Sequence, residues 1–439
     1  MKKRTKLVAL LMAMVLVMGS MTACGGDDSK SDNNNTSSDD NKKTETQDVT
    51  LTVWAPQEDQ KDYSDVDSKF GGKKLLEYMC DQFNEEHPEW NITFKYAVCG
   101  EDVAKDEVTK DVAAAADVYM YAGDQVKTLV DAGALLPIAD QQLTDVKENN
   151  AENALTAVTV DNKVYGVPYT PNTWFLYYDK SKYSEEEVKS LDTMLAKDLG
   201  KCKYNFAMDL DNGWYIGGFF AASGTNVFER VSDSECKSSI NDESGLGAAK
   251  AILALTQNKK VLCDNDAQVA MSNAKKGNCA AFCSGTWSAA DAKKAYGDNY
   301  AAAKLPSVTI NGKEVQLNSV GSYKYVGVNP NTENAQAAQA LAIYLASEQC
   351  QLDRFTARGV SPTWAGLSDQ VKDDVATAAQ AEQLQYMYIT PLDGTFNNNY
   401  WTTLESLGKG MLNKEITDKN LQKQLDQAAK NMVTDITKK

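Results

Sequence analysis

The sequence predicts an α/β protein with more than one domain. Its apolar residues change repeatedly between the alternating pattern of strands and the three-to-four-residue spacing of helices. Residues 49–121 follow the order strand, helix, strand, helix, strand, which is the unit of a parallel sheet with right-handed crossovers. A second series of strands and helices follows between residues 184 and 305. Apolar residues make up 43% of the 439-residue chain, enough for more than one packed core.

The N-terminus has the composition of an export signal. Basic residues precede an apolar run at 7–18, which is too short to span a bilayer as a helix but suits the core of a signal peptide. Met21-Thr-Ala-Cys24 resembles the bacterial lipobox, so residues 1–23 are predicted to be removed and Cys24 to be lipidated. A plain signal peptide with an incidental cysteine is the alternative. Residues 24–47 are polar and are predicted to form a disordered tether.

The first series of elements is well marked in the sequence. Strands are predicted at 49–54, 91–98 and 117–121, and helices at 75–86, where His87-Pro88 ends the helix, and near 105–115. Another helix is expected at 129–136, with a break at Gly133.

An extended run at 164–178 separates the two series. Pro168 and Pro171 lie within it, and because proline cannot donate to a ladder they argue against a central strand. We therefore expect a segment that crosses between domains.

The second series has its own sheet. Helices are predicted at 184–195, 215–222 and 246–257, and strands at 204–208, 279–283 and 299–305. A returning strand is expected at 325–328, a helix that rejoins the first series at 335–346, and C-terminal helices over 404–432. A further helix before Gly277 has candidate N-caps at Asp264 and Asp266 and should end at this glycine in a left-handed conformation. Ser284 and Gly285 then turn the chain, and Ser288 can cap a helix through 295. Trp287 is thereby presented at the carboxyl end of a strand, the edge where open α/β sheets bind ligands.

Charge and cysteine content narrow the classes of partner. The formal charge is −16, so phosphate backbones and anionic lipid are poor partners, and nucleic acid is not expected. Eight cysteines besides Cys24 would allow four disulfides in an exported chain. Cys279 and Cys283 cannot pair if they share a strand, because they would be about 13 Å apart. Cys80 and Cys99 could meet, and the redox state stays open.

Several kinds of catalytic site are missing from the sequence. The single histidine, His87, beside a proline at a helix end, fits a cap or surface role. With it alone there is no His-rich zinc site and no Ser-His-Asp triad, and no Gly-x-x-x-x-Gly-Lys loop occurs. The run 209–213 lacks the spacing of a calcium loop and is expected to be a turn. We expect no catalytic residue, metal or cofactor, although abundant carboxylates leave a paired-acid glycosidase open.

The motif around Trp287, together with the strand ending in Trp54 and the helix with Phe83-Asn-Glu-Glu-His-Pro, resembles the extracellular solute-binding proteins of ABC sugar importers. This resemblance covers nearly everything from residue 49 onward. It implies a two-lobed periplasmic-binding-protein fold of type II, in which each lobe is a central β-sheet flanked by helices and hinges join the lobes. The expected N-terminal lobe is 48–170 plus 327–378, and the C-terminal lobe is 171–326 plus 379–439.

The resemblance also implies a sugar site. Sugars offer C–H faces that stack on aromatic rings and hydroxyls that need carboxylate or amide partners. The positions that match the family's site are Tyr121, Asp124, Trp287, Trp401, Trp214 and Glu58. Three positions depart from the best-known maltose binders: Asn172 and Asn212 stand where glutamates are expected, and Glu405 where an arginine is expected. Amides still bind hydroxyls, so a sugar remains the expected ligand, while its identity and length stay open.

The opening Trp54-Ala-Pro-Gln-Glu-Asp59 looks most like malto-oligosaccharide binders of Gram-positive bacteria. The resemblance therefore implies a monomeric lipoprotein on the extracellular face of the cell membrane, anchored by lipid only, that hands an oligosaccharide to ABC permease subunits. The alternatives are a binder of another sugar, an exported glycoside hydrolase, and an adhesive surface lipoprotein.

Overall fold

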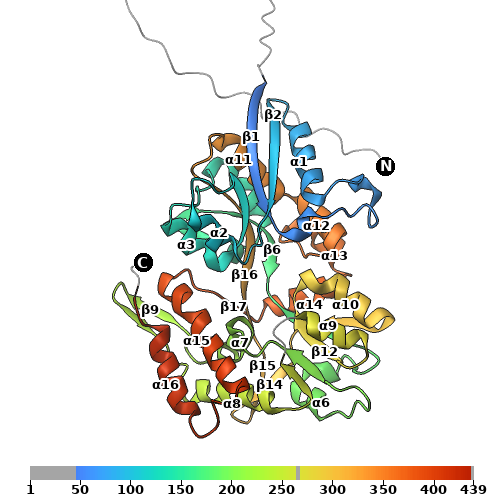
Figure 1. Cartoon of the computed structure of the whole chain (residues 1–439), viewed down its shortest axis with the longest axis vertical. Helices are drawn as coiled ribbons and strands as arrows, with labels where there is room; N and C mark the ends of the chain where they lie inside the picture. The colour runs from blue at the N-terminus through green and yellow to red at the C-terminus, as the bar shows by residue number, and fades with distance from the viewer. Residues whose placement is uncertain (1–45, 264–266, 437–439) are drawn as a thin grey trace, which may run out of the picture. The chain divides into compact units, whose positions relative to one another are not determined.

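The structure is a computed structural model that describes residues 46–263 and 267–436 (Figure 1). The predicted signal peptide, Cys24 and nearly all of the tether lie outside the described residues, as do the candidate caps Asp264 and Asp266. Two sheets, each with its own core, organise the described part, and we call them and the elements packed on them the first and second lobes.

The first lobe is built on six strands among the described residues. They are β17 (Met387–Ile389), β16 (Ser319–Val328), β3 (Val118–Ala122), β1 (Gln47–Ala55) and β2 (Trp90–Val98) in spatial order, with β6 (Val167–Asn172) paired to β16. β1 is parallel to β2 and to β3, as the β-α-β-α-β order predicts, whereas β16 is antiparallel to β3. The sheet is therefore mixed rather than parallel throughout.

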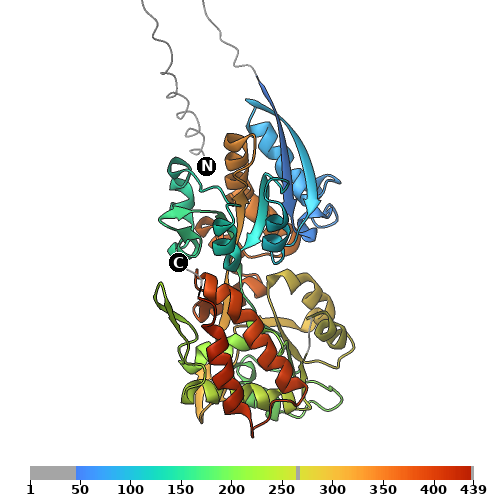
Figure 2. The same cartoon turned by 60° about the vertical axis from the view of Figure 1, so that its left-hand side comes forward.

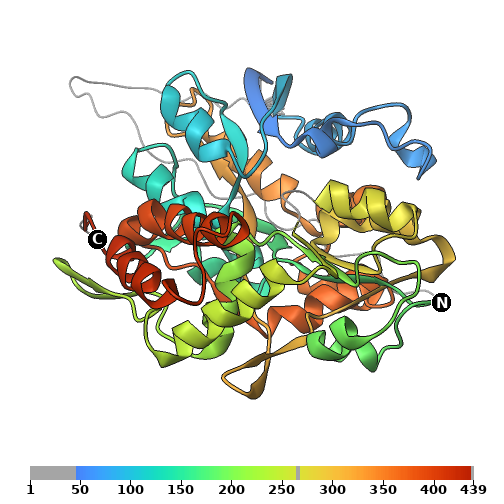
Figure 3. The ribbon, with the colours of Figure 1, turned by 60° about the horizontal axis from the view of Figure 1, so that its bottom comes forward.

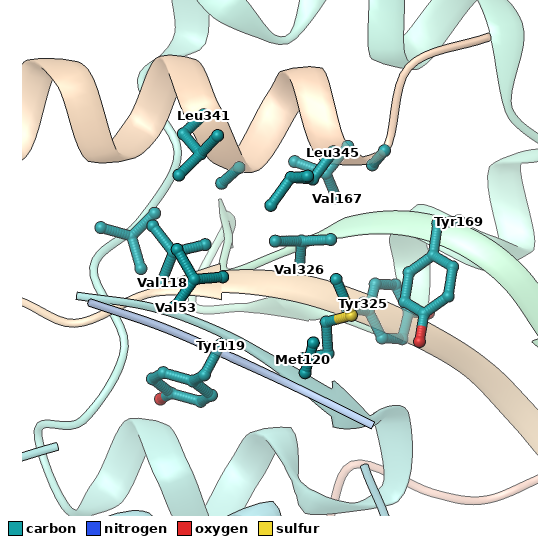
Figure 4. Close-up of a cluster of buried hydrophobic side chains, with 14 of the residues drawn as sticks. Val53, Val118, Tyr119, Met120, Val167, Tyr169, Tyr325, Val326, Leu341 and Leu345 are labelled. Carbon is teal, nitrogen blue, oxygen red and sulfur yellow. The ribbon is translucent and has the colours of Figure 1, made fainter. Parts of the chain in front are cut away.

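Helices cover this sheet. They are α1 (Leu75–Glu86), α2 (Ala104–Lys110), α3 (Val126–Asp131), α4 (Thr144–Asn149), α5 (Glu152–Thr156), α11 (Ala335–Leu345) and α12 (Glu348–Arg358). Leu341 and Leu345 of α11 face Val326 and Val118, whereas Tyr119 lies on the opposite face of the sheet (Figure 4). All of these side chains are buried, so the sheet is covered on both faces here.

The second lobe has a five-stranded sheet among the described residues, in the order β11 (Val261–Cys263), β8 (Phe206–Met208), β12 (Ala281–Ser284), β7 (Phe175–Asp179) and β13 (Tyr300–Ala303). β8 is parallel to β11 and β12, while β7 is antiparallel to β12 and β13. The packed helices are α6 (Leu191–Ala196), α7 (Gly213–Ser223), α8 (Glu243–Gln257), α9 (Ala267–Lys275), α10 (Ala289–Tyr296), α14 (Val375–Leu384), α15 (Gly394–Leu412) and α16 (Leu421–Met432). α15 and α16 lie side by side in both side views, as do α9 and α10 in Figure 3 (Figures 1, 2 and 3).

Short elements complete the described chain. Three hairpins are formed by β4 (Thr159–Val160) with β5 (Lys163–Val164), β9 (Glu229–Ser232) with β10 (Glu235–Lys237), and β14 (Ser307–Ile310) with β15 (Lys313–Gln316). α13 (Ser368–Val371) and the 3₁₀ turns η1 (Gln57–Gln60), η2 (Ser68–Phe70), η3 (Gly123–Gln125), η4 (Asp140–Gln142), η5 (Glu187–Lys189), η6 (Thr286–Ser288), η7 (Gly297–Asn299) and η8 (Ala365–Leu367) make up the rest.

β6 and β16 both connect the lobes, and the described segment 359–374 makes a further connection, from α12 of the first lobe to α14 of the second. β6 contains Pro168 and Pro171, and among the described strands it pairs only with β16, which agrees with the prediction that these prolines exclude a central position. β16 pairs with β17 at its start and with β6 and β3 further along. β16 is a long and almost continuously buried strand, and it therefore runs from one lobe into the other.

Several predicted bounds need correction. α2 ends at Lys110 instead of near 115, because Asp111 is extended and begins a turn. α3 ends at Asp131, two residues before Gly133, whose φ is +65°. The helix expected at 184–195 is a 3₁₀ turn and a short helix, η5 and α6. The C-terminal helices expected over 404–432 are α15 and α16, of which α15 begins earlier, at Gly394. Gly277 has a φ of +72°, as predicted for the residue that ends α9.

The eight cysteines of the described part are free thiols, including Cys80 and Cys99. Cys80 is fully buried on α1, where burial is the main cause that raises its pKa above the usual thiol range. Cys99 instead directs its Sγ toward the Gly100 carbonyl. The pairing of Cys80 with Cys99 that the sequence allowed is therefore not formed.

Candidate ligand-binding cleft

A cavity of about 670 Å³ is lined by residues of both lobes. Six of the eight predicted site residues line it: Glu58, Asp124, Asn172, Trp214, Trp287 and Trp401. We call this cavity the cleft. The first three come from the first lobe or its crossing strand β6, and the three tryptophans come from three separate elements of the second lobe.

Trp214 is held at the first turn of α7. The Asn212 side chain accepts a hydrogen bond from the Trp214 backbone N–H at 2.9 Å and so caps the helix. Gly213 allows α15 to approach closely, since a Cβ there would lie 3.1 Å from the Trp401 carbonyl oxygen. The cap and the glycine together bring Trp214 and Trp401 to one wall of the cleft.

Trp287 follows β12 after a sharp turn. Gly285 lies directly against its indole, where a Cβ would come within 2.0 Å of the ring, and the Tyr177 hydroxyl donates to the Gly285 carbonyl at 2.9 Å. The Trp287 ring stacks on Trp214 with centroids 5.7 Å apart and planes 21° apart. These contacts fix the indole at the carboxyl end of the strand, where the sequence predicts it.

Trp401 is buttressed by aromatic neighbours on its own helix. Its ring packs edge-on against Tyr400, with centroids 4.7 Å apart, and against Phe396. Packing thus sets the positions of all three indoles in the cleft. Because these side chains are already ordered, little of their conformational entropy is lost when a ligand stacks on them.

Two predicted residues lie elsewhere. Tyr121 is fully buried in β3, where its hydroxyl donates to the Tyr165 carbonyl at 3.1 Å and its ring stacks on Tyr325. β3 lies between β1 and β16 with both faces covered, so the structure places this ring in the core, not in the cleft. Asn212 caps α7 and lines two smaller cavities beside the cleft.

A charged network forms the first-lobe wall of the cleft. Glu101, Lys324 and Arg358 all line the cleft, and the Lys324 Nζ lies 3.2 Å from the Glu101 carboxylate. The Tyr169 hydroxyl donates to the same carboxylate at 2.5 Å. Burial raises the pKa of Glu101, but Lys324, Arg358 and Tyr169 outweigh it and hold this pKa below its usual range.

Behind this wall, Asp59 pairs with two arginines. Arg354 Nε donates to Asp59 at 2.8 Å and Arg358 makes a second ion pair with it. Burial would raise the pKa of Asp59, but the two guanidinium groups hold it below its usual range. This cluster anchors η1, and with it Glu58, against the C-terminal end of α12.

Lys324 also reaches the second lobe. Its Nζ lies 5.6 Å from the Trp287 ring centroid, a cation–π distance, while its other neighbour is Glu101 of the first lobe. Sequence reasoning missed Glu101, Lys324 and Arg358, because an ion pair between residues so far apart in the chain leaves no local pattern.

Two carboxyl groups have pKa values above the usual range for aspartate. Burial raises the pKa of Asp124 to about 6. Burial and the neighbouring Asp211 carboxyl raise the pKa of Asp209 to about 7. A hydroxyl that donates a hydrogen bond to either carboxylate would stabilise its ionised form and lower this pKa.

Within residues 46–263 and 267–436, no cluster of three or more His, Cys, Asp or Glu side chains is placed to hold a metal ion. The same residues include no helix with the length and hydropathy that crossing a membrane requires.

Comparison with known proteins agrees with this architecture. A galactooligosaccharide-binding protein of Bacillus subtilis (strain 168) is 28% identical over 327 residues, covering 71% of this chain and 75% of that protein. A maltooligosaccharide ABC transporter solute-binding lipoprotein of Streptococcus pneumoniae serotype 4 (strain ATCC BAA-334 / TIGR4) is 26% identical over 61% of this chain and 65% of its own length.

Solved structures are similar over most of the chain. One chain, solved with acarbose, is 34% identical and superposes with a TM-score of 0.78, covering 87% of this chain and 98% of that one. A maltodextrin-binding protein from L. casei BL23 without ligand is 25% identical with a TM-score of 0.73 and the same coverage. The family described as bacterial extracellular solute-binding protein matches residues 78–382. This chain therefore belongs to the bacterial extracellular solute-binding protein family.

Proposed function

We propose that this chain is the solute-binding component of an ABC sugar importer and captures a malto-oligosaccharide in the cleft. The observation that carries the proposal is the meeting of three tryptophans with Glu58, Asp124 and Asn172 in one cavity. Indoles offer faces for the C–H surfaces of sugar rings, and carboxylates and amides accept or donate to hydroxyls. Relatives named for maltodextrin and maltooligosaccharide binding, and the similar chain solved with acarbose, favour an α-glucan-derived ligand.

The mechanism that we infer is closure around the ligand. The ligand can contact the tryptophans of the second lobe and the carboxylates of the first at the same time only when the lobes approach each other. Ligand binding therefore shifts the equilibrium between the open and closed conformations toward the closed one. The lobes would be 48–170 plus 327–378 and 171–326 plus 379–439, with the hinge in the connecting segments. The closed protein then docks on the permease, and no chemical step takes place on this chain.

The predicted lipid anchor would place the protein at the cell membrane. Lipidation of Cys24 would hold a monomer on the extracellular face of the cell membrane, with residues 24–47 as the tether. One named relative is itself a lipoprotein, which supports this assignment.

A second candidate ligand is a galacto-oligosaccharide. The relative from Bacillus subtilis is named for that sugar, and Asn172, Asn212 and Glu405 depart from the pattern of the best-known maltose binders. Both candidates share the same cleft and differ only in the sugar.

Titration of intrinsic tryptophan fluorescence tests the proposal. The protein from Asp48 onward is titrated with maltose through maltoheptaose and then with galacto-oligosaccharides, and the sugar is recovered for mass analysis. A saturable shift with unchanged sugar is expected for the malto-series. A response only to galacto-oligosaccharides would show that these sugars, and not malto-oligosaccharides, are the ligand. Cleaved sugar would show that the protein is a hydrolase. No response to any sugar would overturn the proposal.

Replacement of Trp287 by Ala should weaken binding of the best malto-oligosaccharide by about 1–3 kcal/mol, because a desolvated aromatic anchor is lost. Isothermal titration calorimetry measures the change. Trp364→Ala is the matched control, since Trp364 does not line the cleft. Equal losses in the two variants, or none in Trp287→Ala, would contradict the role of the Trp287 indole.

A further inference from the structure

A buried amide without partners lies on α15 of the second lobe. Both polar atoms of the Asn397 side chain, Oδ1 and Nδ2, are shielded from solvent and have no hydrogen-bond partner among the described residues. An amide that is taken out of water without replacement hydrogen bonds costs free energy. Few such groups occur in folded proteins, so this one calls for a physical explanation.

The flank of α15 that carries Asn397 follows from its neighbours along the helix. Phe396 is buried in the second-lobe core, and the Asn399 side chain on one flank donates to the Thr434 carbonyl at 2.5 Å, next to the end of α16. Side chains four residues apart lie on the same side of a helix, so Asn397 shares the other flank with Trp401. Trp401 lines the cleft. Asn397 therefore lies on the cleft side of α15, one turn before the tryptophan.

The cleft side of α15 meets the first lobe at α3. The two helices lie against each other, and α3 begins directly after the turn that places Asp124 in the cleft. The C-terminal half of α15 is enclosed by its own lobe, where Gly408 lies against the Leu210 carbonyl. The contact with α3 therefore falls to the N-terminal half, which is the part that carries Asn397.

This contact makes the burial of Asn397 depend on how closely the lobes approach each other. When a hinge opens, the facing surfaces of two lobes separate and water reaches them. Water would then supply the hydrogen bonds that the Asn397 amide lacks in the present arrangement. Closure removes that water, so the cost of the unpaired amide falls on the closed conformation alone.

We propose that Asn397 holds the ligand-free protein open. Its amide is hydrated when the lobes are apart and unpaired when they meet, so it shifts the equilibrium toward the open conformation until a bound sugar outweighs it. The inference rests on the proposed function of the cleft and extends it, because it gives a residue that does not line the cleft a part in setting the affinity. A protein whose binding-competent conformation is only partly populated binds more weakly by that fraction.

Small-angle X-ray scattering and calorimetry of two variants and one control test the inference. Asn397→Leu replaces the amide by an apolar group of similar size, and Asn397→Met makes the same change with a more flexible side chain. Asn398→Leu is the matched control, because Asn398 is the next residue of the helix and is exposed. Scattering is recorded without sugar and with saturating maltotetraose. Each protein is titrated with maltotriose and maltotetraose after circular dichroism has shown a wild-type fold.

The expected result is a smaller radius of gyration for the ligand-free Asn397 variants, the wild-type radius at saturation, and binding that is about five- to thirtyfold tighter. Asn398→Leu should match the wild type in all three measurements. A wild-type radius without sugar in both Asn397 variants would overturn the inference and leave the proposed function standing, even if the variants resist urea better. If the wild-type protein binds neither sugar, the malto-oligosaccharide assignment fails, and the radii of the ligand-free proteins still decide the inference.

Discussion

At the scale of single residues, the cleft holds a carboxyl group at a cost to stability. Asp124 follows β3 in a short 3₁₀ turn and lines the cleft, where burial raises its pKa to about 6 from an ordinary value near 4. Because the folded state binds this proton more tightly than the unfolded state, the group disfavours folding once it ionises. Sites that bind ligands commonly retain such destabilising groups.

Asp124→Asn should therefore raise the free energy of unfolding at pH 8 by about 1–3 kcal/mol. At pH 4 the gain should disappear, because Asp124 is then protonated in the folded protein and the cost of its ionisation is absent. Urea denaturation at the two pH values measures both quantities.

Asp369→Asn serves as the control, since the Asp369 side chain is 91% exposed and should change stability by less than about 0.5 kcal/mol at either pH. A stabilisation by Asp124→Asn that is equal at pH 4 and pH 8 would contradict this account of Asp124.

The predicted residues that line the cleft come equally from the two lobes, and one residue of each lobe, Tyr121 and Asn212, lies elsewhere. Trp287 could be placed because it follows a local signal, a Gly-x-Trp turn after a strand, whereas Trp214 was placed by the family resemblance alone. The N-cap role of Asn212, which was expected among the site residues, emerged only from the structure.

Tyr121 could not be placed from its pattern, because a strand buried on both faces gives no alternation that separates the core from the cleft. Only the contacts with Tyr165 and Tyr325 show where its ring lies.

At the scale of elements, η1 and α12 are joined by charges, not by apolar packing alone. Asp59 is fully buried between Arg354 and Arg358, and Arg354 also stacks on Tyr169 with 4.6 Å from guanidinium to ring centroid. Removing one partner of a buried ion pair leaves an uncompensated charge. This cluster should therefore matter more to stability than the many exposed pairs of the molecule.

Asp59→Ala should lower the free energy of unfolding by about 3–5 kcal/mol, because two buried guanidinium groups lose their carboxylate. Chemical denaturation measures the loss, and it should be accompanied by weaker sugar binding, since η1 carries Glu58 into the cleft.

The control variant is Lys73→Met, which breaks the ion pair between Lys73 and Asp81. Both of these side chains are more than 40% exposed. That change should cost less than about 1 kcal/mol. Similar losses in the two variants would show that the buried cluster has no special role.

The order of elements was largely predictable, and the connections between lobes were not. Hydrophobic spacing predicted α1 and the parallel strands β1 to β3, because each is defined by a local period. The antiparallel pairing of β16 with β3 and of β7 with β12 depends on chain segments that return from a distance. Glu101, Lys324 and Arg358 were missed for the same reason, since the returning strand β16 and helix α12 bring them together.

At the scale of the whole molecule, one side chain bridges the lobes at the cleft. Lys324 lies on β16, pairs with Glu101 of the first lobe and places its ammonium over the Trp287 ring of the second. A cation–π contact of this kind is worth about 0.5–2 kcal/mol. In a hinge-bending protein, that free energy favours approach of the lobes in the absence of ligand.

Lys324→Met should shift the ligand-free populations toward separated lobes by about two- to thirtyfold, which follows from losing 0.5–2 kcal/mol. Small-angle X-ray scattering should then give a larger radius of gyration for the variant without sugar and the wild-type value at saturation. Lys105→Met, which alters another cleft lysine without a tryptophan partner, should leave both values unchanged. An unchanged radius in ligand-free Lys324→Met would contradict the bridging role.

The central claim is that the cleft captures an oligosaccharide between the tryptophans of one lobe and the carboxylates of the other. A crystal structure of the protein with the malto-oligosaccharide that binds most tightly tests it most directly. The account predicts sugar rings in contact with Trp287 and Trp401 and hydroxyls within hydrogen-bond distance of Asp124 or Glu58. A sugar bound elsewhere, or in contact with one lobe alone, would contradict it.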